Sequence, residues 1–180
     1  MGRVYRATHV LMDKQVALKV IHSELAHIED ITRRFELEAK SSSRLTDPHC
    51  ISVTDFGRTE DGTLFLVMEL LDGVSLEERL AVSGGFPVPK ALDIAKQMLR
   101  GLAHAHAQGV VHRDLKPENV YLTTHGEETD FVKILDFGIA KLATGGEDTG
   151  MGVNLTRTGV VFGTPKYLSP EQALGDKVDQ

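Results

Sequence analysis

The stretch His112-Arg113-Asp114-Leu115-Lys116-Pro117-Glu118-Asn119 decides the fold of this chain. Two further stretches follow it in order, Asp136-Phe137-Gly138 and Gly163-Thr164-Pro165-Lys166-Tyr167-Leu168-Ser169-Pro170-Glu171. A pattern with five fixed residues, such as the one in the first stretch, recurs by chance about once in several million starting positions. In a chain of 180 residues, its presence is therefore not an accident.

The residues before this stretch favour strands first and helices later. Short β-branched runs predict strands, and apolar residues spaced by charged ones predict amphipathic helices. The predicted strands cover residues 4–7, 16–21, 51–56 and 63–68, and the predicted helices cover residues 29–45, 76–80 and 89–108. Pro48 is expected to end the first helix and Gly109 the last. The expected core face of the last helix consists of Leu92, Ala95, Met98, Leu99, Leu102 and Ala103.

The residues after the stretch predict short strands and a long loop. Residues 120–122 and 132–135 are expected to pair as a hairpin around a polar insert, 123–130. The Gly- and Thr-rich residues 144–159 contain few core-forming side chains and are expected to be mobile. Strands followed by helices predict an α+β fold with two lobes. We expect a β-rich lobe over residues 1–68, a hinge over 69–73, and a mainly helical lobe over 74–180.

Composition excludes several classes of protein. The formal net charge of −6 argues against a nucleic-acid-binding surface, which needs clustered Lys and Arg. The single cysteine, Cys50, excludes an internal disulfide and a Cys-based zinc site, and it is expected to be a small, part-buried apolar residue. No apolar run approaches the ~20 residues that span a bilayer, and no signal peptide opens the chain. A cytoplasmic setting is therefore expected.

The first stretch resembles the catalytic-loop pattern H-R-D-L-x-x-x-N of protein kinases. The match extends over essentially the whole chain and is similar in detail to the eukaryotic-like serine/threonine kinases of bacteria. The resemblance implies a bilobal kinase fold and ATP-dependent phosphorylation of Ser and Thr hydroxyls on protein substrates. One alternative is a pseudokinase, an ATP-binding scaffold without transfer activity. A kinase for small molecules is a second alternative, but it would lack the stretch Gly163–Glu171 that docks a peptide.

The resemblance also implies a role for each polar residue of the loop. Asp114 would orient the substrate hydroxyl and accept its proton, and Lys116 would offset charge on the γ-phosphate. Asn119 and Asp136 offer hard oxygen ligands that suit Mg²⁺, with Mn²⁺ as a second candidate metal. Gly138 would give the backbone the freedom to move Asp136 in or out.

A lysine and a glutamate of the first lobe complete the implied ATP site. Lys19 lies in Val16-Ala17-Leu18-Lys19, which is similar to the V-A-I-K of the family's third strand, and would hold the α- and β-phosphates. Its carboxylate partner must come from residues 29–45, where Glu36 and Glu38 are both candidates. The family pattern favours Glu38, because Ala39 follows it.

The adenine pocket is expected between the lobes. Its implied members are Val4 and Ala17 above the ring, the backbone of Glu69 and Leu71 at its edge, Met68 as gatekeeper, and Tyr121 on the floor. The family usually places an aliphatic residue where this chain has Tyr121. Gly2 is the remaining glycine of the implied phosphate-covering loop.

Regulation by phosphorylation is implied by Arg113, which precedes the catalytic Asp114. A buried cation needs an anion, and a phosphothreonine supplies a charge of about −2. Thr156 and Thr158 are the expected acceptors, with autophosphorylation in trans between two copies of the kinase. Thr164 is expected to take part in substrate docking.

Both ends lack pieces that the family pattern contains. Glycines of the phosphate-covering loop are expected upstream of Met1, and a buried helix that anchors the catalytic loop is expected beyond Gln180. Removing such a helix exposes apolar surface worth about 25 cal/mol per Å². We therefore expect these 180 residues alone to be unstable and weakly active or inactive. Any membrane anchor would also lie in the missing sequence.

Overall fold

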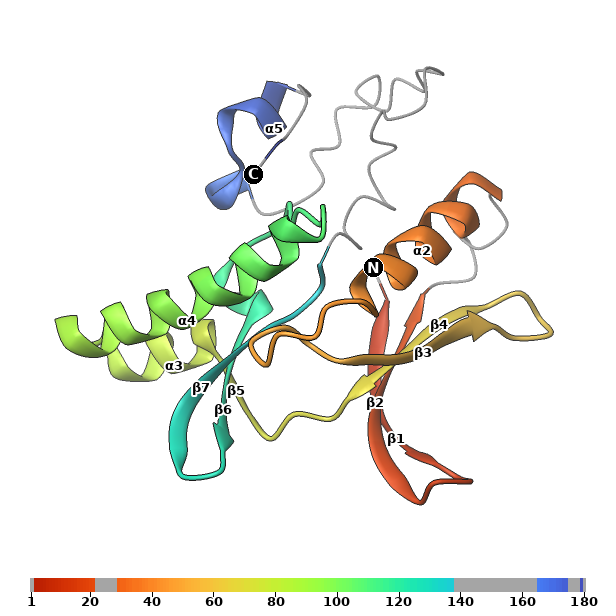
Figure 1. The fold of residues 1–180 in the computed structure, drawn as a ribbon, viewed down its shortest axis with the longest axis horizontal. Helices are drawn as coiled ribbons and strands as arrows, with labels where there is room; N and C mark the ends of the chain where they lie inside the picture. The colour runs from red at the N-terminus through yellow and green to blue at the C-terminus, as the bar shows by residue number, and fades with distance from the viewer. Residues whose placement is uncertain (1, 22–28, 138–164, 175–178, 180) are drawn as a thin grey trace.

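The computed structural model describes residues 2–21, 29–137, 165–174 and 179 of the chain. Within these ranges the chain forms a four-stranded sheet with one helix, beside a helical part that carries a three-stranded sheet (Figure 1). The predicted α+β class with two lobes is confirmed.

The first lobe is built on an antiparallel sheet with the strand order β1-β2-β4-β3. Its strands are β1 (Arg3–His9), β2 (Lys14–Ile21), β3 (Val53–Arg58) and β4 (Leu64–Glu69). Because β2 is central, Ala17 lies opposite Arg6 on one neighbour and Met68 on the other. All four predicted strands are present.

Helix α2 (Glu29–Ser42) covers one face of this sheet. Phe35 and Ala39 are each 1% exposed and pack against Ile21, Leu64 and Leu66. The helix ends before the predicted residue 45, and well before Pro48, because its last turn tightens. Arg44 N donates to Ser41 O (3.2 Å) and Leu45 N donates to Ser42 O (3.1 Å). The tighter turn sends Leu45 into the core of the second lobe.

The second lobe combines two helices with a small sheet. Its larger elements are β5 (Gly73–Ser75), α3 (Leu76–Ser83), α4 (Val88–Ala107), β6 (Val120–His125) and β7 (Glu128–Ile134), with the sheet order β5-β6-β7. Shorter pieces are a 3-10 turn at Pro117–Asn119, another at Pro165–Tyr167, and α5 (Pro170–Leu174). Val120, Val132 and Ile134 are fully buried in the core. No helix in the described ranges is both long and apolar enough to cross a membrane.

The predicted hairpin is present, but its strands are longer than expected. Most of the supposed insert 123–130 belongs to β6 and β7, which turn at Gly126 (φ 60°). Tertiary contacts hold these polar residues in the hairpin. Asp130 forms ion pairs with Arg79 (3.2 Å) and Lys90 (3.0 Å).

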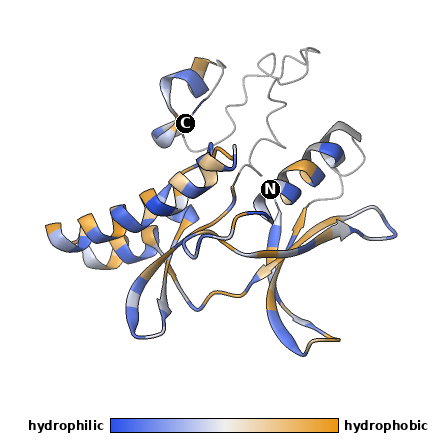
Figure 2. Cartoon of the chain, viewed as in Figure 1, coloured by the Kyte–Doolittle hydropathy of each residue, from blue (hydrophilic) through white to orange (hydrophobic). Residues whose placement is uncertain are grey.

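The predicted core face of α4 is wrong for four of its six residues. Leu92 and Leu99 are 56% and 65% exposed, and Ala95 and Ala103 are exposed as well. Figure 2 shows apolar and polar residues interspersed along α4.

Contacts with residues from other elements select the buried face of α4 instead. Ile94, Gly101 and Ala105 are buried, and Met98 and Leu102 are half-buried against the same core. At Gly101 an added Cβ would lie 3.1 Å from side-chain atoms of both His49 and Ile134, so the small residue allows the close approach.

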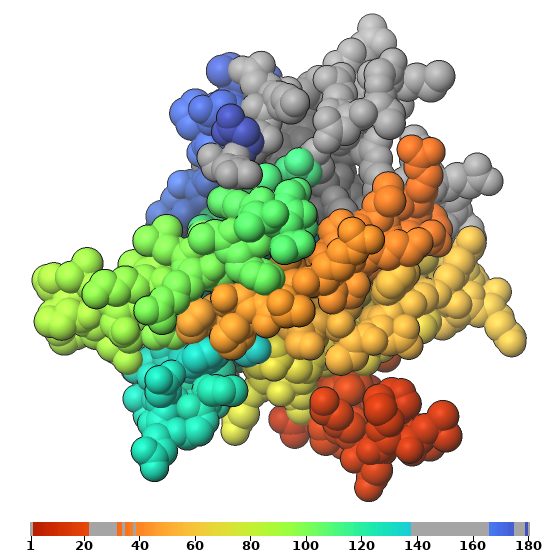
Figure 3. Space-filling model, viewed as in Figure 1, coloured from red at the N-terminus to blue at the C-terminus, as the bar shows by residue number. Residues whose placement is uncertain are grey.

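The segment that follows α2 joins the two lobes. Ile51 N donates to Ile134 O (3.0 Å), and Ile134 N donates to His49 O (2.7 Å), so Cys50 and Ile134 form a parallel bridge. Figure 3 shows this segment, in orange, between α4 and the sheet of the first lobe. The bridge fixes β7 against the first lobe just before Asp136.

Candidate active site

His112 anchors the loop between α4 and β6. It is 3% exposed, and its Nε2 lies 2.7 Å from the carbonyl oxygen of Leu135, while Asp114 N lies 3.3 Å from its Nδ1. Because a carbonyl can only accept and an amide N–H can only donate, the imidazole is neutral with its proton on Nε2. Burial lowers the pKa of His112, which favours the same neutral form. The ring also packs on Phe137 at a centroid distance of 5.0 Å.

Two of the three residues predicted to act in catalysis, Lys116 and Asn119, contact the carboxylate of the third, Asp114. Asp114 Oδ2 lies 3.0 Å from Lys116 Nζ and 3.1 Å from Asn119 Nδ2. Asn119 Nδ2 also donates to the backbone oxygen of Asp114 at 2.8 Å. Because Oδ2 carries both side-chain contacts, Oδ1 is the better placed oxygen for a further hydrogen bond.

Asp136 and Lys19 come from different lobes and form an ion pair. Lys19 Nζ lies 2.6 Å from Asp136 Oδ1, with side chains that are 14% and 32% exposed. Asp136 has a φ of 59°, in the left-handed region that residues other than glycine rarely adopt. This ion pair connects the two lobes at the site, although Lys19 and Asp136 are 117 positions apart in the sequence.

The oxygen donors fit a hard divalent cation. Both contacts of the Asn119 amide to Asp114 use Nδ2, which leaves Oδ1 as the atom that can face a cation. Among the described residues no group of three or more His, Cys, Asp or Glu side chains could hold a metal ion. A site with few protein ligands suits Mg²⁺, which usually keeps waters and substrate phosphate oxygens in its coordination shell.

The predicted glutamate partner of Lys19 stays a prediction. The side chain of Glu38 lies outside the described residues, although its backbone belongs to α2. Glu36 is exposed. The partner that the structure describes for Lys19 is Asp136.

Several residues expected around adenine lie together between the lobes. Ala17 (8% exposed) and Met68 (7%) form an apolar cluster with Ile51, against which Leu71 packs. Val4 lies opposite Lys19 in the β1–β2 ladder but is 59% exposed.

Two other predicted ATP-binding residues have strand neighbours that define their place. Tyr121 is half-buried on β6, opposite Lys133 of β7. Gly2 precedes β1, where an added Cβ would lie 2.4 Å from Val20 O. Strand packing alone therefore requires glycine at this position.

An ion pair that sequence reasoning missed supports the hinge. Lys133 is 9% exposed, and its Nζ lies 2.7 Å from Glu69 Oε1 and 3.4 Å from Cys50 O. The same Glu69 oxygen accepts from Ser52 N at 2.8 Å. A lysine within the apolar run Val132-Lys133-Ile134-Leu135 was the available signal, because a buried ammonium requires a partner.

Burial raises the pKa of the Cys50 thiol to about 12, so the thiol stays protonated.

Arg113 is held in an unusual conformation. Its φ is 65°, and its Nε is buried without a hydrogen-bond partner among the described residues. The predicted phosphorylation sites Thr156 and Thr158 lie outside the described residues, as do Thr164 and Gly138.

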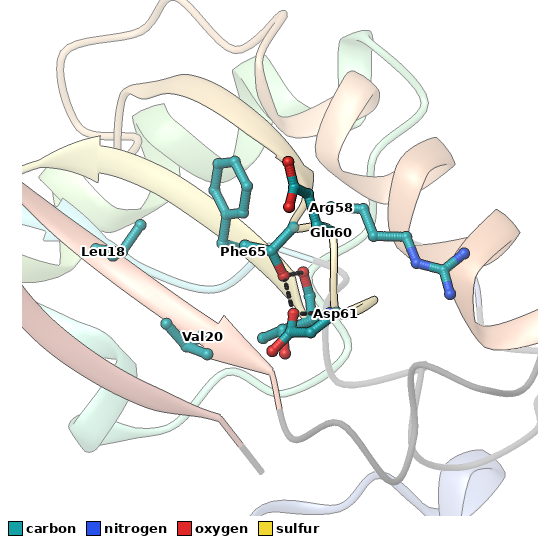
Figure 4. A pocket seen from close by; sticks show the side chains of 8 residues that line it. Leu18, Val20, Arg58, Glu60, Asp61 and Phe65 are labelled. Atoms are coloured by element: carbon teal, nitrogen blue, oxygen red, sulfur yellow. Dashed lines mark hydrogen bonds between the residues drawn. The ribbon is translucent and has the colours of Figure 1, made fainter.

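A shallow pocket on the first lobe lies away from these residues (Figure 4). Its lining includes Leu18, Val20 and Phe65. Side chains alternate across a strand, so Leu18 and Val20 face the opposite side of β2 from Lys19. The pocket is therefore on the outer face of the sheet.

Comparison with known proteins identifies the class to which this arrangement belongs. The model of the protein kinase domain family matches residues 1–179. The chain is 47% identical over 179 residues to the serine/threonine-protein kinase pkn3 of Myxococcus xanthus, covering 99% of this chain and 32% of that protein. It is 37% identical over 175 residues to the serine/threonine-protein kinase PrkC of Bacillus subtilis, covering 97% of this chain and 25% of that protein.

Solved structures agree with the sequence relatives. The crystal structure of the PknI kinase domain of Mycobacterium tuberculosis superposes with a TM-score of 0.74 at 30% identity, covering 99% of this chain and 61% of that one. The chain belongs to the protein kinase family, and its curated relatives are bacterial serine/threonine kinases. It spans about a third of the length of pkn3 and a quarter of that of PrkC. The family acts on protein substrates and uses ATP with a divalent metal.

Proposed function

We propose that this protein transfers the γ-phosphoryl group of ATP to Ser and Thr hydroxyls of protein substrates. The observation that carries the proposal is the convergence of Lys116 and Asn119 on the carboxylate of Asp114, together with the Lys19–Asp136 ion pair. Phosphoryl transfer depends on positioning and charge stabilisation more than on covalent chemistry. Such a reaction requires a carboxylate that accepts the proton of the hydroxyl, and fixed cations that stabilise the charge of the phosphoryl group.

Each residue of the site has a proposed role. Asp114 accepts the proton of the substrate hydroxyl, and Lys116, bound to it at 3.0 Å, stabilises charge on the transferred group. Lys19 holds the α- and β-phosphates and exchanges its contact with Asp136 for them. Glu38 is the proposed second partner of Lys19.

Asn119 and Asp136 are the proposed ligands of Mg²⁺, through Asn119 Oδ1 and the carboxylate of Asp136, with Mn²⁺ as a substitute. A bound divalent cation would neutralise charge on the β- and γ-phosphate oxygens. The hydrogen bonds from Asn119 Nδ2 to Asp114 support this assignment, because they orient the amide oxygen.

The adenine site is proposed around the apolar cluster between the lobes. Ala17, Met68 and Leu71 contribute to it, and the packing of the first two supports this placement. Val4 and Tyr121 would cover the two faces of the ring, Gly2 would lie near the phosphates, and the Glu69 backbone would bind the ring edge. The lobe boundaries proposed with this site are 1–68, the hinge 69–73, and 74–180.

Phosphate transfer from ATP to peptides tests the proposal. The intact natural protein is incubated with labelled ATP, Mg²⁺ and matched peptides that contain Ser, Thr or Tyr. We expect label on the Ser and Thr peptides only, and none without the metal. ATP binding without transfer would instead indicate a pseudokinase. Transfer to a small alcohol but not to peptides would indicate a kinase for small molecules.

We further propose that phosphorylation of Thr156 or Thr158 activates the kinase in trans. The buried, unpartnered Nε of Arg113 supports this proposal, because a phosphate would supply the acceptor that it lacks among the described residues. The double variant Thr156→Ala/Thr158→Ala should lower activity, and mapping after incubation with ATP should find phosphate on one of these residues in the parent protein. An autophosphorylation rate that does not depend on protein concentration would contradict transfer between two copies.

Thr164 is the residue proposed to dock the protein substrate. The cytoplasm, which supplies ATP, is the proposed compartment.

A further inference from the structure

Helix α5 (Pro170–Leu174) reaches the catalytic loop through the side chain of Gln172. Its Nε2 donates a hydrogen bond to the backbone carbonyl oxygen of Arg113. That carbonyl belongs to the peptide that joins Arg113 to Asp114. The contact therefore acts on the backbone immediately before the proposed catalytic carboxylate.

The peptide between Arg113 and Asp114 is held at both of its polar groups. Its N–H, which is Asp114 N, lies 3.3 Å from His112 Nδ1, and its C=O accepts from Gln172 Nε2. With one bond on each side, rotation of the peptide plane would break a hydrogen bond. The plane sets the direction in which the Cα–Cβ bond of Asp114 leaves the backbone.

Such support is needed because Arg113 adopts a φ of 65°. The left-handed region is unfavourable for a residue with a Cβ, and the conformation persists only where its surroundings hold it. A flip of Arg113 to the ordinary right-handed region would move both of its peptide groups. The bond from Gln172 opposes that flip.

The amide of Gln172 is itself oriented. Its Oε1 accepts from Ser169 N at 3.1 Å, and its own backbone N donates to Ser169 Oγ at 3.3 Å, a reciprocal pair at the start of α5. Since Ser169 N can only donate, the amide oxygen must face Ser169. The amide nitrogen is then left to face Arg113 O, which can only accept.

We propose that Gln172 is a positioning residue for phosphoryl transfer, which fixes the Arg113–Asp114 peptide plane and so the direction of the Asp114 carboxylate. The inference rests on the proposed kinase activity. It adds a residue outside the catalytic loop and outside the ATP site, and it makes the placement of α5 a condition for turnover. Gln172 contacts neither ATP nor substrate in this role.

Gln172→Glu in the intact natural protein tests the proposal. The introduced carboxylate has nearly the same shape and still accepts from Ser169 N, but when ionised it cannot donate to Arg113 O. We expect kcat to fall about tenfold, as for a lost hydrogen bond with repulsion added. KM for ATP should stay unchanged, and the melting temperature should fall by no more than a few degrees, because one local hydrogen bond is lost. Gln108→Glu, an exposed glutamine after α4, makes the same charge change and should leave kcat unchanged.

A pH profile separates positioning from general structural damage. Protonation of the introduced carboxyl restores a donor, so the deficit in kcat relative to the parent should narrow as the pH is lowered towards the ordinary glutamic acid pKa of about 4.3. Equal kcat for the Gln172→Glu and Gln108→Glu variants would overturn the proposal. Parallel losses of kcat, ATP affinity and melting temperature at every pH would overturn it as well.

Hydrogen–deuterium exchange tests the same contact without requiring activity. Exchange of the Asp114 amide, measured on peptides that cover residues 112–119, should be faster in Gln172→Glu than in Gln108→Glu. An inactive parent protein would refute the proposed function, and the exchange result would then still decide whether Gln172 holds the loop. Unchanged exchange would refute the positioning role.

Discussion

In the catalytic loop, the contacts that orient Asp114 with His112 and Asn119 come from two and five positions away. At the hinge, the carboxylate of Glu69 is held by Lys133, which is 64 positions away. These two contacts of the loop are local, so one stretch of sequence encodes them. The contact at the hinge depends on bringing β4 and β7 together. We therefore expect separable sets of contacts to control turnover and nucleotide affinity in the proposed kinase.

Removing the carboxylate of the loop should give the largest effect. We expect Asp114→Asn to lower kcat by roughly 10²–10⁴, because a general base contributes about that much. ATP affinity should change little, since the hinge and the Lys19–Asp136 pair remain. Peptide phosphorylation and nucleotide binding measure the two quantities. Asp93→Asn, on the exposed side of α4, is the control and should keep parent activity.

Breaking the ion pair between Lys133 and Glu69 at the hinge should mainly affect ATP affinity. Lys133→Met leaves Glu69 without its cation. Because the pair is part-buried, the unfolding free energy should fall by less than the about 3–5 kcal/mol that breaking a fully buried pair costs. KM for ATP should rise several-fold while kcat falls less. Urea unfolding and ATP titration check both expectations, with exposed Lys96→Met as the control. A fall in kcat at constant KM would show that the loop and hinge are not separable.

A smaller effect is expected where α2 meets the residue after Asp136. The hydroxyl of Ser42 is buried and donates to the carbonyl oxygen of Phe137 at 3.3 Å. Ser42→Ala should lower the unfolding free energy by about 1 kcal/mol, because the buried carbonyl loses its donor. Ser43→Ala removes an exposed hydroxyl from the next position and should be nearly neutral. Equal melting curves for the two variants would contradict this role of Ser42.

Acidification should lower the unfolding free energy through protonation of His112. Its pKa in the fold lies below the ordinary value of 6.5, mainly because the ring is buried, so the unfolded chain binds a proton more readily. The unfolding free energy should therefore fall as pH decreases below 6.5, until the folded-state pKa is reached. The stabilisation is fully present above pH 6.5. Chemical unfolding at several pH values should give a shallower dependence for His112→Asn than for the parent.

Sequence patterns predicted the elements well where the signal was local. The strands of the first sheet and the hairpin were expected from short β-branched runs. The core face of α4 was predicted wrongly, because apolar residues occur on more than one side of this helix. Which side is buried depends on His49 and Ile134, which meet the helix at Gly101.

The same division applies to the candidate site. Asp114, Lys116 and Asn119 could be selected from one motif, because a fixed spacing in one loop brings their side chains together. Asp136 could be selected from a second motif. The ion pair between Lys133 and Glu69 could not be, since neither residue indicates the other along the chain. The bond from Gln172 to Arg113 O was equally hidden, because its acceptor is a backbone carbonyl that carries no sequence signal.

The sequence by itself determined the class of protein, the order of its elements and the residues that carry the proposed chemistry. Those features depend on short-range spacing, which the covalent chain sets directly. Only the tertiary structure decided which face of α4 is buried, how Lys19 meets Asp136, and that Gln172 holds the peptide before Asp114. Most of these contacts join segments far apart in the chain, so they form only when packing offsets the entropy lost in bringing the segments together.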